Sequence, residues 1–250
     1  MRIFTVRGIT KSGKTTTIEE IIKELCSRGY RVGSVKEIHY EQFAIDTEGS
    51  NTHRHRMAGS QLVTARGIYE TDVLFQEKLP MEKIIPLYED DYDYLVLEGV
   101  SDMDVPTILT AHNTQELDQR WSPWVFAVSG RITGETHHYK DVPVIDATKE
   151  IARLVDLIEE KTYHHLPNFP PKCCTACGYS CKGLGLAIME GKASRQDCVL
   201  AKSEVTLTID GKSIDMVPFV QKILKNALLS VVSELDGYQE NAKIEVRIHG

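Results

Sequence analysis

Apolar and polar residues follow two alternating patterns over the first 165 positions of the chain. Short apolar runs typical of buried strands occupy residues 2–7, 30–38, 91–100, 106–111, 123–130 and 142–146. Apolar residues recur at helical spacing over residues 16–29, and residues 149–161 predict an amphipathic closing helix. Strands that alternate with helices predict an α/β fold with a mostly parallel sheet and helices on both faces.

The pattern changes after residue 165. Residues 166–172 are rich in proline and predict a linker. Residues 203–216 alternate between apolar and polar around an Asp-Gly pair, which is a hairpin signal. A helical stretch at 218–235 and a strand-like stretch at 242–250 follow. This ββαβ order predicts a small α+β tail, with no catalytic constellation in it.

A glycine-rich segment links the first predicted strand to the first predicted helix. It reads GITKSGKT and fits the P-loop pattern G-x-x-x-x-G-K-[ST] in the strand–loop–helix context that this motif requires. Lys14 would reach the β- and γ-phosphates, and Thr15 would place its hydroxyl on Mg²⁺. Lys11 could add charge near the phosphates or face solvent. The predicted nucleotide-binding residues are Gly8, Lys11, Ser12, Gly13, Lys14, Thr15 and Thr16.

Two carboxylates are candidates for the catalytic group beside Lys14. Glu98 ends the apolar run of residues 94–97, as in a Walker B strand, and could hold Mg²⁺ through water or polarise the attacking water. Asp46 follows the second strand and could serve the Mg²⁺ shell, or could be an ordinary turn residue. The H-R-H-R run at 53–56 predicts a solvated helix face or an arginine that binds an anion.

Net charge and compartment narrow the possible partners. A net charge of −7 argues against a general nucleic-acid binder. The first residues do not form a signal peptide, and no run approaches the roughly 20 apolar residues that span a membrane. We therefore expect a cytoplasmic protein with no membrane partner. In that compartment, clustered cysteines are more often metal ligands than disulfides.

Five of the six cysteines lie within residues 173–198. Their spacing is Cys174-x2-Cys177-x3-Cys181-x16-Cys198, with Cys173 outside the pattern. Three close thiolates and one remote thiolate are typical of a [4Fe–4S] cluster. Zinc held by four cysteines and a redox dithiol remain the alternatives. The sixth cysteine, Cys26, is predicted to be a small buried side chain on the first helix.

The segment after the P-loop is similar to the molybdopterin-guanine dinucleotide biosynthesis protein B (MobB) family. That family follows its P-loop with V-K-H-x-x-H-x-x-x-x-D-x-x-G-x-D-[ST]-x-R-x-x-x-A-G-[AS]. The positions that match are Lys36, Asp46, Gly49, Thr52, Arg54, Ala58, Gly59 and Ser60. Glu37 and Asn51 depart from the pattern, and the likeness covers roughly residues 1–165. The cysteine segment resembles a small iron–sulfur domain of corrinoid/acetyl-CoA-synthase subunits.

The MobB resemblance implies a GTP-binding accessory protein of molybdenum or tungsten cofactor biosynthesis. It would assist the formation of molybdopterin guanine dinucleotide, with weak GTPase activity at most, and would form a homodimer. Its implied partners are guanine nucleotide and a molybdopterin guanylyltransferase or a molybdoenzyme, and its implied cofactors are GTP and Mg²⁺. The cysteine segment adds an iron–sulfur cluster to the expected cofactors. No N-K-x-D motif is present, so GTP over ATP rests on the resemblance.

Two other functions are compatible with the same residues. One is an ATP-dependent metallocluster maturation or electron-transfer protein, and the other is a non-hydrolysing adaptor that is ordered by nucleotide. In each case we expect three parts: a P-loop nucleotide-binding domain at 1–165, a cysteine-rich iron–sulfur module at 166–200 and a small ββαβ module at 201–250.

Overall fold

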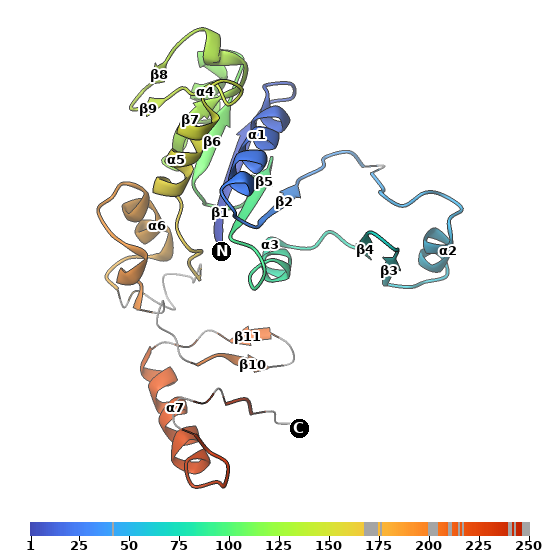
Figure 1. The fold of residues 1–250 in the computed structure, drawn as a ribbon, viewed down its shortest axis with the longest axis vertical. Helices are drawn as coiled ribbons and strands as arrows, with labels where there is room; N and C mark the ends of the chain where they lie inside the picture. Colours follow the sequence, from blue (N-terminus) through green and yellow to red (C-terminus); the bar gives the residue numbers. More distant parts are fainter. Residues whose placement is uncertain are drawn as a thin grey trace. The chain divides into compact units, whose positions relative to one another are not determined.

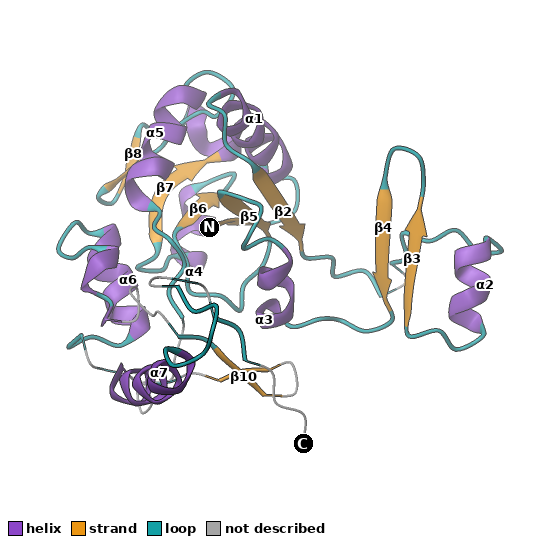
Figure 2. Cartoon of the chain, turned by 60° about the horizontal axis from the view of Figure 1, so that its bottom comes forward, coloured by secondary structure: helices purple, strands orange, loops and turns teal. Residues whose placement is uncertain are grey.

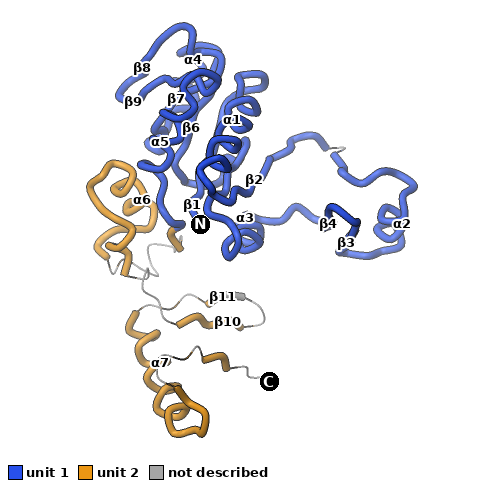
Figure 3. Tube along the Cα trace, viewed as in Figure 1, with its two compact units in different colours: residues 1–165 blue, residues 166–250 orange. Residues whose placement is uncertain are grey.

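The computed structural model of the 250-residue chain describes most of its length. The described residues are 1–41, 43–167, 175, 177–199, 205–209, 212–214, 216, 218–239, 242 and 244–246. The chain divides into two compact units, residues 1–165 and 166–250 (Figure 3). The boundary coincides with the start of the proline-rich segment. The finer division of the second unit into two modules stays a prediction.

A five-stranded parallel sheet forms the centre of the first unit (Figure 1). Its strands are β1 (Arg2–Gly8), β2 (Val32–Lys36), β5 (Tyr94–Glu98), β6 (Thr107–Thr110) and β7 (Val125–Ser129). The spatial order is β2-β5-β1-β6-β7, and every pairing is parallel. The inner strands β5, β1 and β6 are buried on both faces over most of their length, which explains their continuous apolar runs. The predicted α/β fold with a mostly parallel sheet is confirmed.

Helices cover both faces of this sheet. They are α1 (Lys14–Ser27), α3 (Met81–Ile84), η1 (Ile85–Leu87), α4 (Thr114–Arg120), η2 (Gly130–Gly134) and α5 (Ile151–Lys161). Met81 of α3 packs in one cluster with Ile3 and Leu97, and Leu117 of α4 packs in another with Leu109. Figure 2 shows α1 and α5 together on the other face. A short hairpin, β8 (His138–Tyr139) and β9 (Val142–Pro143), precedes α5.

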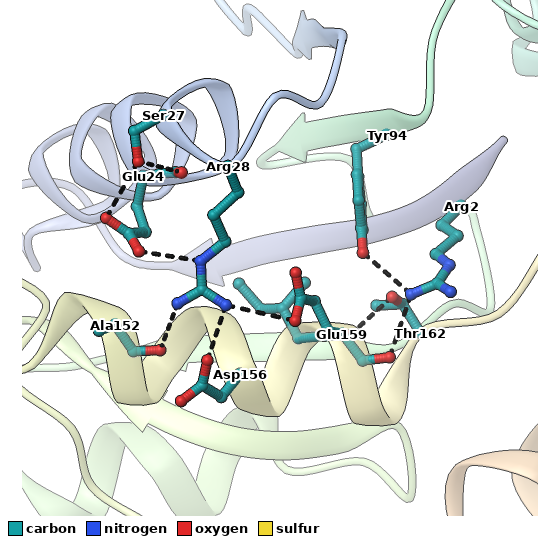
Figure 4. A network of polar contacts seen from close by, with 10 residues as sticks. Arg2, Glu24, Ser27, Arg28, Tyr94, Ala152, Asp156, Glu159 and Thr162 are labelled. Carbon is teal, nitrogen blue, oxygen red and sulfur yellow. Dashed lines mark hydrogen bonds and ion pairs between the residues drawn. The ribbon is translucent and has the colours of Figure 1, made fainter.

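Arg28 connects the end of α1 to the closing helix α5 (Figure 4). Its guanidinium donates to Glu24 at 2.9 Å, to Asp156 at 2.7 Å and to Glu159 at 3.2 Å. A fourth hydrogen bond of 3.0 Å reaches the carbonyl of Ala152. These carboxylates raise the pKa of Arg28 above its usual value, and the hydrogen bond to Asp156 is the largest cause. Arg28 thereby anchors the carboxyl end of α1, the end away from the P-loop, to α5.

Residues 37–80, here called the arm, leave the sheet after β2 and return at α3. The arm contains α2 (Asn51–Met57) and an antiparallel hairpin of β3 (Leu62–Arg66) and β4 (Thr71–Phe75). The H-R-H-R run lies on α2, which fits the predicted helix face. The hairpin was not predicted. Among the described residues, β3 and β4 form a sheet of two strands only.

Within the described residues of the second unit, the first regular elements are α6 (Cys181–Met189) and a short turn, η3 (Arg195–Asp197). The predicted tail hairpin is present as β10 (Leu207–Ile209) and β11 (Lys212–Ile214), and the predicted helix is present as α7 (Pro218–Val232). The last predicted strand is not seen at residues 244–246, which are described and have no regular structure. In the part of the chain that the structure describes, no helix is long and apolar enough to cross a membrane.

Candidate functional site

The loop between β1 and α1 is held by backbone contacts with the end of β7. Gly13 has φ 102°, and a Cβ at this position would lie 2.9 Å from the Cα of Gly130. The amide of Arg131 donates to the carbonyl of Ser12 at 3.0 Å. The buried Ser12 hydroxyl lies 2.7 Å from the hydroxyl of Thr110. These contacts fix the loop at the amino end of α1, where the first backbone N–H groups have no partner within the helix.

The side chain of Lys14 turns back into this loop. Its Nζ donates to the carbonyl of Gly8 at 3.0 Å and to the carbonyl of Ile9 at 2.6 Å. Burial lowers the pKa of Lys14, and the nearby Glu98 carboxylate opposes that shift. Neutral carbonyls are weaker acceptors than phosphate oxygens, so a phosphate in the loop would compete for this ammonium group.

Thr15 and Glu98 meet at the carboxyl edge of the sheet. The Thr15 hydroxyl donates to Oε1 of Glu98 at 3.0 Å. Lys36, at the end of β2, places its Nζ 3.2 Å from the same oxygen. The three residues come together because β2, β5 and β1 are parallel neighbours whose carboxyl ends lie at one edge. Hydroxyl and carboxylate oxygens are the ligands that Mg²⁺ prefers, so this pair of side chains fits the predicted metal.

The partners of the Asp46 carboxylate among the described residues lie within its own segment of the arm. Its Oδ1 accepts from Ser50 at 2.9 Å and from Thr52 at 2.7 Å, and its Oδ2 lies 3.4 Å from Arg56. These interactions lower the pKa of Asp46, with the bond from Thr52 as the largest cause. Ser50 caps α2 by accepting from the amide of His53. The carboxylate thus fastens the first turn of α2, and its catalytic role stays a prediction.

The remaining predicted loop residues differ in exposure. Ser12 is buried, whereas the side chains of Lys11, Thr15 and Thr16 are exposed. Lys11 has a left-handed backbone with φ 63°, which is uncommon for a residue other than glycine. Whether its ammonium group contacts phosphate stays a prediction.

Three of the four predicted cysteine ligands lie in the described part of the second unit. Cys177 is half-buried in a turn with Gly178 (φ 82°), Cys181 begins α6, and Cys198 is buried after η3. Cys174 lies outside the described residues. Within the described residues, no three His, Cys, Asp or Glu side chains form a group that could hold a metal. The iron–sulfur module is therefore a proposal.

The prediction for Cys26 was wrong, because this side chain is exposed on α1. The apolar residues Ile21 and Leu25 of the same helix are fully buried. Cys26 follows Leu25 directly and therefore points about 100° away around the helix, toward solvent.

Two residues of the site were not found from the sequence. Lys36 belongs to a motif position that carried no assigned role, and His112 lies between the P-loop and α4. Asn113 caps α4 by accepting from the amide of Glu116, and the Glu116 carboxylate accepts from the amide of His112 at 2.8 Å. The N-x-x-E spacing, which is typical of a helix start, was the available signal.

A glycine-rich loop between a strand and a helix, with Lys14, Thr15 and Glu98 at the carboxyl edge of a parallel sheet, defines a P-loop nucleotide-binding domain. Residues 3–129 match the family described as "MobB: Molybdopterin guanine dinucleotide synthesis protein B". The chain belongs to this family, and the resemblance seen in the sequence is confirmed.

Relatives of known name share one or both units. A Methanocaldococcus jannaschii protein named "Putative molybdopterin-guanine dinucleotide biosynthesis adapter protein" is 27% identical over 253 residues, which cover 99% of this chain and 97% of the relative. The "Molybdopterin-guanine dinucleotide biosynthesis adapter protein" of Haemophilus influenzae is 26% identical, over 64% of this chain and 88% of its own length. The first relative therefore extends through both units, and the second covers a share close to that of the first unit.

The crystal structure of Bacillus subtilis MobB supports the same fold. It superposes with a TM-score of 0.56 at 23% identity, and the match covers 66% of this chain and 100% of that structure. At this identity, the comparison concerns the fold alone.

Proposed function

We propose that this chain is an adapter protein of molybdopterin guanine dinucleotide biosynthesis that binds GTP and Mg²⁺ at its P-loop. The observation that carries the proposal is the convergence of Lys14, Thr15 and Glu98 at one edge of the sheet. Membership of the MobB family and the names of both relatives support the pathway.

Each of these side chains has a part in holding the nucleotide. Lys14 would exchange the carbonyls of Gly8 and Ile9 for β- and γ-phosphate oxygens. Thr15 would direct its hydroxyl oxygen to the metal, and Glu98 would hold the metal's water or orient the attacking water. When bound, Mg²⁺ neutralises charge on the phosphates. Turnover is expected to be weak, because no arginine of the chain is assigned to the transferred phosphate.

Calorimetric titration with GTP and with ATP, each with Mg²⁺ and under anaerobic conditions, tests this function. We expect binding of GTP with a clear preference over ATP, and a slow release of phosphate. A preference for ATP would overturn the adapter proposal in favour of an ATP-dependent cluster protein. Absence of binding by either nucleotide would overturn the P-loop assignment itself.

A guanylyltransferase that joins GMP to molybdopterin is the partner that this pathway requires. We propose that the adapter binds such an enzyme, or a molybdoenzyme that receives the product. The departures at Glu37 and Asn51 lie in the segment that leads from β2 into α2. Glu37 is ion-paired with Lys78, so the two ends of the arm are joined where it leaves and re-enters the sheet.

The arm supports the further proposal that two copies of the chain form a homodimer. Val63 is buried on one face of the hairpin, whereas Leu62, Val73 and Phe75 on the other face are 51%, 50% and 40% exposed. A two-stranded hairpin is marginally stable by itself and has unpaired strand edges. A second arm offers the same apolar face and the same edges, which suits an isologous two-fold interface.

Replacing Val73 with lysine is expected to convert the dimer to a monomer, because the ammonium group would be desolvated between two apolar faces. Light scattering after gel filtration should give twice the chain mass for the wild type and one chain mass for Val73→Lys. Leu87→Lys is the matched control, since Leu87 is an apolar residue 60% exposed outside the arm. A wild type that elutes as a monomer at micromolar concentration would refute the proposed dimer.

The spacing of Cys174, Cys177, Cys181 and Cys198 supports a [4Fe–4S] cluster in the second unit. The left-handed turn at Gly178 lets the backbone reverse between Cys177 and Cys181. The M. jannaschii relative spans the same unit, so the cysteine segment is part of the shared length.

A further inference from the structure

His112 joins the P-loop to α4 through both of its ring nitrogens. It follows β6 at the carboxyl edge of the sheet, two residues after Thr110. Its Nε2 lies 3.1 Å from the carbonyl oxygen of Lys11, at the tip of the P-loop. Its Nδ1 lies 3.2 Å from Oε2 of Glu116, the carboxylate that also accepts from the backbone amide of His112.

These two contacts can be satisfied together by only one form of the ring. A carbonyl oxygen and an ionised carboxylate are both acceptors, and a neutral imidazole has a single N–H. The pKa of Glu116 is lowered, first by the hydrogen bond from the backbone amide of His112, so this group is ionised wherever a histidine titrates. Only the imidazolium donates to both partners. A neutral ring would direct a lone pair at one of them.

The carbonyl that His112 holds belongs to the strained part of the loop. Lys11 has φ 63°, and its carbonyl shares a planar trans peptide with the amide of Ser12. In such a peptide the C=O and N–H point in opposite directions. Holding the Lys11 carbonyl toward His112 therefore turns the Ser12 amide the other way, where it lies 3.4 Å from the carbonyl of Ile9.

Ile9 is the point at which the loop's donors converge in this structure. Its carbonyl accepts from Lys14 Nζ at 2.6 Å and from the Ser12 hydroxyl at 2.8 Å, besides the long contact with the Ser12 amide. If a phosphate binds Lys14 in place of the Ile9 carbonyl, the Ser12 amide, whose contact with that carbonyl is long, is already oriented to donate to the phosphate. The orientation of this one peptide, whose carbonyl contacts His112, thus affects how readily the loop binds an anion.

We propose that protonated His112 is a positioning residue that holds the P-loop in its anion-binding conformation, so that nucleotide affinity falls as the ring loses its proton. The proposal rests on the nucleotide binding proposed above. The charged group that contacts His112 is the Glu116 carboxylate of α4, on which Arg120 of the same helix also acts electrostatically, while Lys11 of the loop contacts the ring through its backbone carbonyl. Arg120 also acts electrostatically on Lys14, so α4 and the loop share one electrostatic environment.

The test compares GTP·Mg²⁺ affinity between about pH 5 and pH 8, the range in which histidine changes charge, for the wild type and two uncharged variants. His112→Gln keeps an amide donor at the position of Nε2, and His112→Asn keeps only the donor at the position of Nδ1. From the acidic to the basic end of this range, we expect the GTP·Mg²⁺ affinity of the wild type to fall about fivefold more than the affinity of His112→Gln falls. A factor of about five corresponds to the loss of one hydrogen bond. His112→Asn should bind about fivefold more weakly than the wild type at the acidic end.

His112→Gln serves as the control for the ionisation of the nucleotide's own phosphate, which titrates in the same range. If the wild type and His112→Gln have the same pH profile, His112 does not couple its charge to binding and the inference fails. It fails equally if His112→Asn binds as tightly as the wild type at the acidic end.

A second measurement needs no nucleotide and separates this inference from the proposed function. The ring protons of His112 and the backbone amide of Ser12 are followed by NMR against pH in the free protein. We expect the Ser12 amide to shift with the same midpoint as the His112 ring, and to remain constant in His112→Gln. A chain that shows this coupling but binds neither GTP nor ATP would overturn nucleotide binding alone. If the chemical shift of the Ser12 amide did not change with the protonation of the His112 ring, the positioning role alone would be overturned.

Discussion

Replacing Lys14 with alanine is expected to lower the affinity for GTP·Mg²⁺ at least about a hundredfold, because two charge-assisted hydrogen bonds to phosphate are lost. Its ammonium group already lies inside the loop, on the carbonyls of Gly8 and Ile9. The fold should be preserved, since those carbonyls are neutral and the Ser12 hydroxyl continues to donate to Ile9. Calorimetry at fixed pH and salt measures the loss.

Lys23→Ala is the matched control for this substitution. Lys23 lies on the same helix, is 69% exposed and pairs with Glu20 one turn away, so its removal takes the same charge from the protein's surface. It should bind GTP as the wild type does. A Lys14→Ala variant that binds within about threefold of the wild type would show that the loop does not hold phosphate through this lysine.

The P-loop and the sheet were predictable because their determinants are local. Gly13 and Lys14 stand at fixed distances along the chain, and the buried strands are continuous apolar runs that a parallel sheet requires. Glu98 could be placed beside the loop before its contacts were known, since the carboxyl ends of parallel strands share one edge. The parallel topology of the sheet was therefore enough to predict the position of Glu98 in space from its position in the sequence.

The arm and the His112 contacts could not be derived in the same way. Val73 and Phe75 alternate as in a strand, but within the described residues their strand pairs with β3 and not with the central sheet, so the α/β pattern of the chain did not predict it. His112 acts through a backbone carbonyl of Lys11, 101 positions away in the sequence. A contact with a carbonyl leaves no trace in residue type, because every residue has one.

For the cysteines, prediction from the sequence is limited for a different reason. Their spacing predicts a cluster through the chemistry of the thiolates, whereas Cys177, Cys181 and Cys198 do not form a group that could hold a metal within the described residues. A cluster supplies much of the free energy that folds such a loop, so the ligands need not be arranged before the metal arrives. The chemical prediction and the geometry are therefore tested by the same substitution.

Cys177→Ser is expected to remove the iron, the labile sulfide and the visible absorption of anaerobically purified protein, because serine replaces one of the four thiolates of the predicted motif. GTP·Mg²⁺ affinity should stay unchanged, since the P-loop unit of residues 1–165 has its own core. Metal and sulfide analysis, with calorimetry on the same sample, gives both readouts.

Cys26→Ser provides the control, because Cys26 is an exposed thiol on α1 outside the predicted motif. It should retain the full iron content. Equal losses in the two variants would mean that the iron is bound adventitiously. A colourless wild type that contains stoichiometric zinc, lost in Cys177→Ser alone, would replace the cluster with a four-cysteine zinc site. Loss of GTP binding in Cys177→Ser would show instead that the metal unit and the P-loop unit fold as one, contrary to the independence of their cores.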